Sequence, residues 1–181
     1  MNRSTAALAG AALATFAASP ALASPVFDAF RNVCGDSHGD FAAIKAAADA
    51  GHWVPTEVAP NTMEGVTVAE SVARQITVGG AKMTLFAWRG SKGTVQVTAC
   101  TVKVTQAPFA GLADDAKTWV GFAPEAATGA KAVWRYTENA GVKSAVQKAD
   151  YDKAAAAGGL DFFTVSQVGP ETVLDLLKIK S

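Results

Sequence analysis

Apolar residues in the first part of the chain after residue 24 recur at helical spacing. They repeat every three or four positions over 26–34, which predicts a short amphipathic helix that ends at Gly35. A second helix is predicted over 41–50, with Asp40 as its N-cap and Gly51 just beyond its last residue. The chain therefore opens with two short helices joined by a polar turn.

The middle of the chain changes from helical spacing to alternation of apolar and polar residues. Segments 72–78 and 83–87 alternate on either side of Gly79 and Gly80, which predicts a β-hairpin. A second turn over 89–93 leads into a β-rich stretch at 94–105. The apolar positions change phase halfway along that stretch, and either a β-bulge or burial on both faces explains the change.

The second half repeats this order of helix and strands. Helical spacing returns over 109–120 and ends at Gly121, and the final segment, 171–179, fits a strand and a helix equally well. Further strands are predicted over 132–137 and 142–147, as a hairpin, and over 160–168. A helix followed by three strands thus occurs twice, which permits an internal duplication although the residues show no repeat.

Runs of strands interrupted by isolated helices are typical of the α+β class. We therefore predict a mostly antiparallel sheet with two to three helices packed on one face. The segment 24–181 is long enough for one domain and too short for two ordinary ones.

The N-terminal segment has the pattern of a cleaved secretory signal peptide. Arg3 precedes an apolar stretch over 6–18, and Ala21-Leu22-Ala23 supplies the small residues that signal peptidase requires. Residues 1–23 are therefore predicted to be removed, leaving Ser24 first. The apolar stretch is shorter than a membrane span, and Ser24 stands where a lipoprotein needs Cys, so no membrane anchor is expected after cleavage.

Charge and composition exclude several classes of function. The chain has 16 basic and 16 acidic residues and therefore no net charge, a balance that does not favour nucleic acid as a partner. No cofactor-binding motif is present, and no cofactor is expected. Arg89, Lys92 and the glycines beside them could meet a phosphate, but they lack the order of a phosphate-binding loop.

Two cysteines in an exported chain are most simply paired. We predict a structural disulfide between Cys34 and Cys100, because the sequence lacks the C-x-x-C spacing of a redox-active thiol. The disulfide and the signal peptide together predict a periplasmic or secreted protein.

The spacing of the first cysteine also carries a resemblance. Phe30-x-x-x-Cys34, an Ala-rich helix that closes in Gly51-His52-Trp53, and a β-rich stretch holding Cys100 resemble small exported proteins encoded in proteobacterial genomes. No activity is known for that group, so the resemblance implies an envelope protein and no particular chemistry.

One polar turn offers candidate chemistry. Asp36, His38 and Asp40 alternate along it and, with His52, could present carboxylates and imidazoles to a divalent metal; the alternative is a solvated capping loop. Ser37 follows Gly and Asp as in the hydrolases named for Gly-Asp-Ser-Leu, but no histidine after His52 could act as its base. No catalytic residue is therefore assigned.

Aromatic residues on predicted strands offer a second candidate site. Trp134 and Tyr136 share one face of a strand and, with Trp88, could line a pocket for a small apolar ligand. The alternative is that all three are core residues. We expect a non-catalytic binding or interaction protein of unknown ligand and partner, with a small metal-dependent hydrolase or an inhibitor-like module acting on an envelope enzyme as alternatives.

Overall fold

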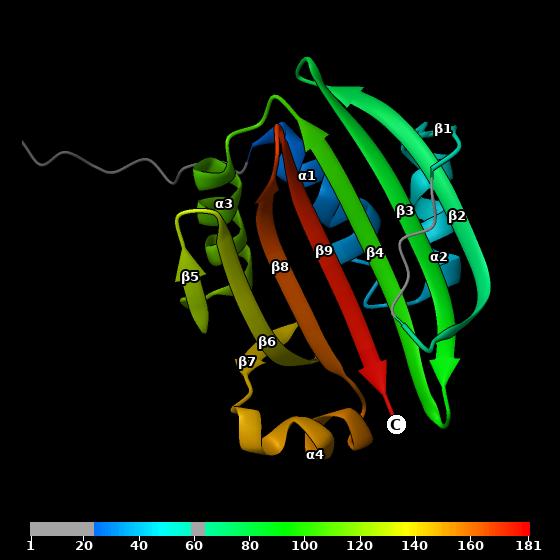
Figure 1. The fold of residues 1–181 in the computed structure, drawn as a ribbon, viewed down its shortest axis with the longest axis vertical. Coiled ribbons are helices and arrows are strands. Elements are labelled where there is room, and N and C mark those ends of the chain that lie inside the picture. The colour runs from blue at the N-terminus through cyan, green and yellow to red at the C-terminus, as the bar shows by residue number, and fades with distance from the viewer. Residues whose placement is uncertain (1–23, 59–63) are drawn as a thin grey trace, which may run out of the picture.

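One antiparallel sheet of nine strands forms the body of the molecule (Figure 1). The computed structural model describes residues 24–58 and 64–181, so the predicted signal peptide lies outside the described residues. The strands are β1 (Val54–Pro55), β2 (Thr67–Val78), β3 (Ala81–Lys92), β4 (Val95–Thr105), β5 (Ala126–Thr128), β6 (Lys131–Asn139), β7 (Val142–Ala145), β8 (Leu160–Val168) and β9 (Glu171–Lys180).

Helices α1, α2 and α3 pack on one face of this sheet, which confirms the predicted α+β architecture. The helical segments are α1 (Pro25–Phe30), the π-helix η1 (Arg31–Gly35), α2 (Phe41–Ala50), α3 (Phe109–Val120), the 3-10 helix η2 (Lys148–Asp150) and α4 (Tyr151–Ala156). Helix α4 lies at the end of the sheet, beside β8 and β9. None of the helices in the described ranges is long and apolar enough to cross a membrane.

The strand order reflects the repeated arrangement of helix and strands. Across the sheet it runs β1-β2-β3-β4-β9-β8-β6-β5, with β7 paired to β6. The last strand of each half, β4 and β9, therefore meet at the centre, and β3 and β8 flank them. This topology fits two similar halves related by an approximate two-fold axis.

The strands settle two alternatives that the sequence left open. The segment at 171–180 is a strand, β9, paired with β4 on one side and β8 on the other. The register between β3 and β4 is continuous from Met83–Val104 to Lys92–Val95, so β4 has no bulge against β3. Its change of phase reflects burial on both faces, because a central strand is covered from either side.

The caps of the helices agree with the sequence at most positions. The Asp40 carboxylate accepts hydrogen bonds from the backbone N–H groups of Ala42 and Ala43, and Gly121 ends α3 at a φ of 91°. At the end of α2, however, Gly51 has a φ of −80° and the left-handed residue is His52, at 59°. A Cβ at Gly51 would lie 3.1 Å from the Trp53 ring, a tight contact that a small shift of the ring would have to relieve.

A cluster of aromatic rings joins the helices to the sheet. Phe30 of α1 stacks on Phe163 of β8 at 5.4 Å between ring centroids, and Trp134 of β6 also stacks on Phe163, at 5.5 Å. Trp119 of α3 meets Phe163 edge-on at 5.4 Å. These contacts fill the layer between helices and sheet and hold α1 and α3 in place.

The predicted disulfide is confirmed. Cys34 of η1 and Cys100 of β4 are bonded, with their Cα atoms 5.6 Å apart. Both cysteines are buried, so the disulfide links the helical layer to the central strand of the sheet from inside the core.

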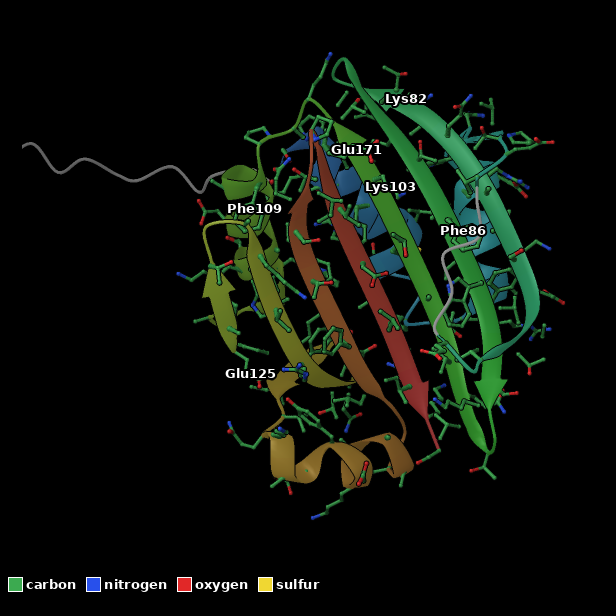
Figure 2. The ribbon with its side chains drawn as sticks, in the orientation of Figure 1. Lys82, Phe86, Lys103, Phe109, Glu125 and Glu171 are labelled. Carbon is green, nitrogen blue, oxygen red and sulfur yellow. A yellow bond between two sulfur atoms is a disulfide. The ribbon has the colours of Figure 1, made fainter. Side chains whose placement is uncertain are left out.

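The opposite face of the sheet carries mixed side chains (Figure 2). Lys103 is exposed there, whereas Trp88 is buried within a second apolar cluster. That cluster consists of Trp88, Val97 and Ala99, with Val66, Phe86, Val95 and Leu177 packed against it. This face therefore has its own small core, in addition to the main core under the helices.

Candidate functional site

The polar turn between η1 and α2, residues 36–40, is held against the sheet by its neighbours. Gly35 at its start is buried against Trp119, and Cys34 anchors the preceding π-helix through the disulfide. His38 and Gly39 both have positive φ angles, 50° and 74°, which fold the chain sharply before α2 begins. We call residues 36–40 the anchored turn.

Ser37 has a structural contact within the anchored turn. Its side chain is buried, and its hydroxyl donates a 2.6 Å hydrogen bond to the carbonyl oxygen of Cys34. Over residues 24–58 and 64–181, neither histidine is hydrogen-bonded to a serine, and both cysteines are in the disulfide. Ser37 therefore caps the end of η1 and has no activating base.

The predicted metal-ligating residues are dispersed. Asp40 caps α2, His38 contacts Glu138, and His52 lies at the far end of α2, a helix of 10 residues. Such a helix is about 15 Å long, so the two imidazoles do not meet. In the part of the chain that is described, no three His, Cys, Asp or Glu side chains are grouped to hold a metal ion.

The aromatic candidates lie inside the protein. Trp134 and Tyr136 point into the main core with 1% of their surface exposed, and Trp88 is 2% exposed in the second cluster. The Trp134 indole N–H donates to the carbonyl oxygen of Phe122, which satisfies its polar group. The structure therefore places these residues on opposite faces of the sheet and brings them to no common cavity.

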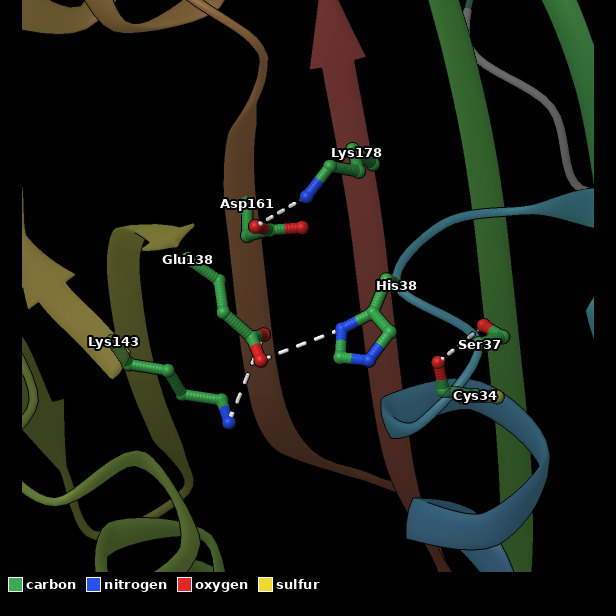
Figure 3. Close-up of polar contacts among 7 residues, drawn as sticks. All are labelled: Cys34, Ser37, His38, Glu138, Lys143, Asp161 and Lys178. Carbon is green, nitrogen blue, oxygen red and sulfur yellow. Dashed lines mark hydrogen bonds and ion pairs between the residues drawn. The ribbon is translucent and has the colours of Figure 1, made fainter. Parts of the chain in front are cut away.

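A group of buried charges that the sequence analysis missed lies beneath the anchored turn (Figure 3). Lys178 of β9 donates a 2.8 Å hydrogen bond to Asp161 of β8, and both side chains are at most 10% exposed. Glu138 of β6 lies between Lys143, at 3.7 Å, and His38 Nδ1, at 3.3 Å. We call Lys178, Asp161, Glu138 and Lys143 the buried charge cluster; His38, whose side chain is 62% exposed, contacts it from the anchored turn.

The buried charge cluster has a shared electrostatic environment. Burial raises the pKa of the Asp161 carboxyl, an effect that Lys178 opposes and the nearby Glu138 reinforces. Burial also raises the pKa of the Tyr136 phenol well above its usual range, with the Asp161 and Glu138 carboxylates adding to the shift. Lys143 is further stabilised by the Trp119 ring, whose centroid is 4.3 Å from its ammonium nitrogen.

The anchored turn also forms one wall of a surface pocket of about 280 Å³. The pocket opens between Gly39 and the ends of β3, β4 and β9, and its other wall is formed by Ala69 of β2. Charged and polar side chains line it, namely Arg89, Ser91, Gln96, Thr98, Lys178 and Lys180. We call this cavity the turn pocket.

Lys178 connects the turn pocket to the buried charge cluster. Its aliphatic chain lies directly beneath Gly39, where an added Cβ would be 2.5 Å from Lys178 Cδ. Its ammonium group reaches past the turn to Asp161, as Figure 3 shows. In this wall of the pocket, Lys178 is therefore held by its ion pair with Asp161, and the anchored turn above it is held by the Cys34–Cys100 disulfide.

Sequence reasoning could have found little of this site. Asp161, Lys178, Glu138 and Lys143 are single charged residues on strands whose order in the sheet was unknown. Their one signal is that Asp161 is in phase with the apolar residues Phe163 and Val165 of the strand predicted over 160–168.

Comparisons with known proteins do not add to this description. No family model and no curated protein matches the sequence, and no solved structure matches the fold.

Proposed function

We propose that the protein is exported, is cleaved after Ala23, and acts as a non-catalytic binding protein in the periplasm or outside the cell. Its ligand binds in the turn pocket. The signal-peptide pattern supports export, and the Cys34–Cys100 disulfide is compatible with an oxidising compartment.

The turn pocket is the observation that carries this proposal. Its walls come from rigid elements, because the anchored turn is tied by the disulfide and the floor consists of central strands. A pocket built on rigid elements binds a ligand with little loss of conformational freedom, which is what a binding protein needs. Its lining supplies several hydrogen-bond donors and, over residues 24–58 and 64–181, no cysteine or histidine.

Native mass spectrometry of protein purified from the periplasm of an expressing cell tests the proposal. The expected polypeptide begins at Ser24 and gains about 2 Da on reduction of the disulfide. The native species should also carry the extra mass of a ligand. A chain that starts elsewhere would contradict the cleavage, and a bare native species would contradict a tightly held ligand.

A blocking variant assigns the ligand to the turn pocket. Ala69 is exposed on the pocket wall, so Ala69→Trp fills the cavity without changing its charge. The variant should lose the extra mass while retaining the circular dichroism spectrum and the disulfide of the parent. If the Trp variant does not fold, Ala69→Leu replaces it. Retention of the extra mass by a folded blocking variant would show that the ligand binds elsewhere.

A further inference from the structure

The charged residues that line the turn pocket all have the same sign. Arg89, Lys178 and Lys180 contribute three cations, and the lining residues among those described include no Asp or Glu, although Glu70 contacts Arg89 from beside the pocket. The whole chain has equal numbers of basic and acidic residues, so this cavity is a local departure from the balance of the molecule.

The three cations differ in how strongly they are already paired. Lys178 is bound to the buried carboxylate of Asp161. Arg89 contacts Glu70 at 3.0 Å, but both side chains are about half exposed, and such surface pairs contribute little stability. Lys180 is exposed and forms no ion pair within the described ranges. Lys180 is therefore free to contact a ligand, and Arg89, which also lies over the Phe41 ring, can do so by exchanging its exposed contact with Glu70.

The neutral lining of the pocket is also suited to an anion. Ser91, Gln96 and Thr98 supply hydroxyl and amide groups that can donate hydrogen bonds to oxygen atoms. A guanidinium group can bind carboxylate or phosphate oxygens through two parallel hydrogen bonds. Arg89 donates a single hydrogen bond to one oxygen of Glu70, so the second of these two bonds is not formed.

We propose that the turn pocket binds a small oxyanion, the phosphate or carboxylate group of a low-molecular-weight ligand. Arg89 and Lys180 contact the anion directly, whereas the ammonium group of Lys178 stays paired with Asp161 and its aliphatic chain forms the pocket wall. Glu70 is displaced from Arg89 when the anion enters. This inference rests on the proposed function, because it names the ligand class of the same pocket.

Titrations with inorganic phosphate and with acetate, followed by NMR of the backbone amides, test the inference. Both probes are small enough for the pocket, and their relative affinities distinguish a phosphate site from a carboxylate site. At least one should cause saturable shifts at Gly39, Gly90 and Ser91. Arg89→Gln and Lys180→Gln should each weaken this binding by about tenfold, the loss expected for one hydrogen bond to a charged group.

Lys103→Gln is the matched control, because it removes the same charge from the exposed opposite face of the sheet (Figure 2). It should leave the affinity unchanged. The inference is overturned if neither probe gives saturable shifts at the pocket, or if Arg89→Gln and Lys180→Gln bind as well as Lys103→Gln.

The outcomes separate this inference from the proposed function. A native ligand that is lost in Ala69→Trp but retained in Arg89→Gln and Lys180→Gln would mean that the pocket binds a neutral molecule, and only the anion inference would fail. A native ligand retained in the folded Ala69→Trp variant would contradict the pocket itself as the binding site.

Discussion

Gly39 is the residue on which the geometry of the anchored turn depends most directly. Its φ of 74° is unfavourable for any residue with a Cβ, and the space is already filled by Lys178. Gly39→Ala must therefore distort the backbone and also displace the lysine from Asp161. We expect a loss of about 2–4 kcal/mol of unfolding free energy, measured by urea denaturation of the oxidised protein.

Gly79→Ala separates the two costs. Gly79 has a φ of 58°, but its Cβ would meet nothing within 4 Å. Only the conformational cost remains there, about 1 kcal/mol. Equal losses in the two variants would show that the contact between Gly39 and Lys178 does not constrain the turn.

Asp175 gives a prediction about pH. It lies on β9 between Thr101 and Thr164, and the Thr101 hydroxyl donates a 2.6 Å hydrogen bond to its carboxylate. Burial raises the pKa of Asp175 above its usual value of 3.8, and this hydrogen bond offsets only part of the effect. The folded state therefore binds its proton more tightly than the unfolded state does.

The sign of the effect follows from linkage. Between pH 3.8 and the raised pKa, the folded protein holds more protons, so this group makes stability increase as the pH falls from neutral. Asp175→Asn cannot titrate and can still accept the Thr101 hydrogen bond. The variant should be at least as stable as the parent at pH 7. Its advantage in unfolding free energy, measured by urea denaturation, should shrink as the pH is lowered toward 4.

The exposed Asp152, on α4, is the control for this measurement. Asp152→Asn should follow the pH profile of the parent. The Asp175→Asn variant should keep part of the pH dependence of the unfolding free energy, because burial also raises the pKa of Asp161. An Asp175→Asn variant that is less stable than the parent at pH 7 would show that the carboxylate is stabilised in the folded state.

At the scale of elements, the disulfide is the main link between the two layers. It joins residues 66 positions apart, η1 to β4, and so restricts the unfolded chain strongly. Replacing Cys34 and Cys100 together by Ala should cost about 3–4 kcal/mol of unfolding free energy. Urea denaturation of the variant, compared with the oxidised and the reduced parent, measures this loss.

The reduced parent provides the control, because it keeps both side chains and loses only the bond. It should unfold at nearly the same urea concentration as the double variant. In both, amide hydrogen exchange should increase first over the anchored turn. A reduced protein as stable as the oxidised one would contradict a stabilising role for the disulfide.

Most elements follow from local patterns, and the failures have physical reasons. The helix over 109–120 and the strand over 160–168 have clear periods, and the structure reproduces both. Segment 171–179 was ambiguous because its inner and outer residues are both apolar, as expected of a strand in the sheet centre. The short strands β1 and β5 and the helix α4 carry too few residues to show a period.

At the scale of the whole molecule, the candidate site could not be read from the sequence because long-range strand pairing creates it. Arg89 and Lys180 come from strands β3 and β9, which lie on either side of β4. Asp161 meets Lys178 only because β8 and β9 pair in one particular register. The sequence predicted the sheet and its disulfide, but not the strand order that brings these charges together.

Ser24, which would be the first residue after the proposed cleavage, contacts Asp115 of α3. The backbone nitrogen of Ser24 is 3.2 Å from Asp115 Oδ2, and its hydroxyl donates a 2.7 Å hydrogen bond to the same oxygen. After cleavage this nitrogen becomes an ammonium group at the N-terminus of α1, where a positive charge opposes the helix dipole. Asp115 is placed to neutralise that charge.

Asp115→Asn should therefore destabilise the mature protein more than a form that keeps residues before Ser24. We expect a difference of about 1 kcal/mol at pH 7, measured by urea denaturation of both forms. The difference should vanish as the pH rises above about 8, because the ammonium group deprotonates there. Asp114→Asn, on the exposed side of the same helix, should affect both forms equally. If Asp115→Asn also affects both forms equally, the ammonium group of the new N-terminus is not stabilised by the Asp115 carboxylate. The contacts of Asp115 with Ser24 would then serve only to start α1.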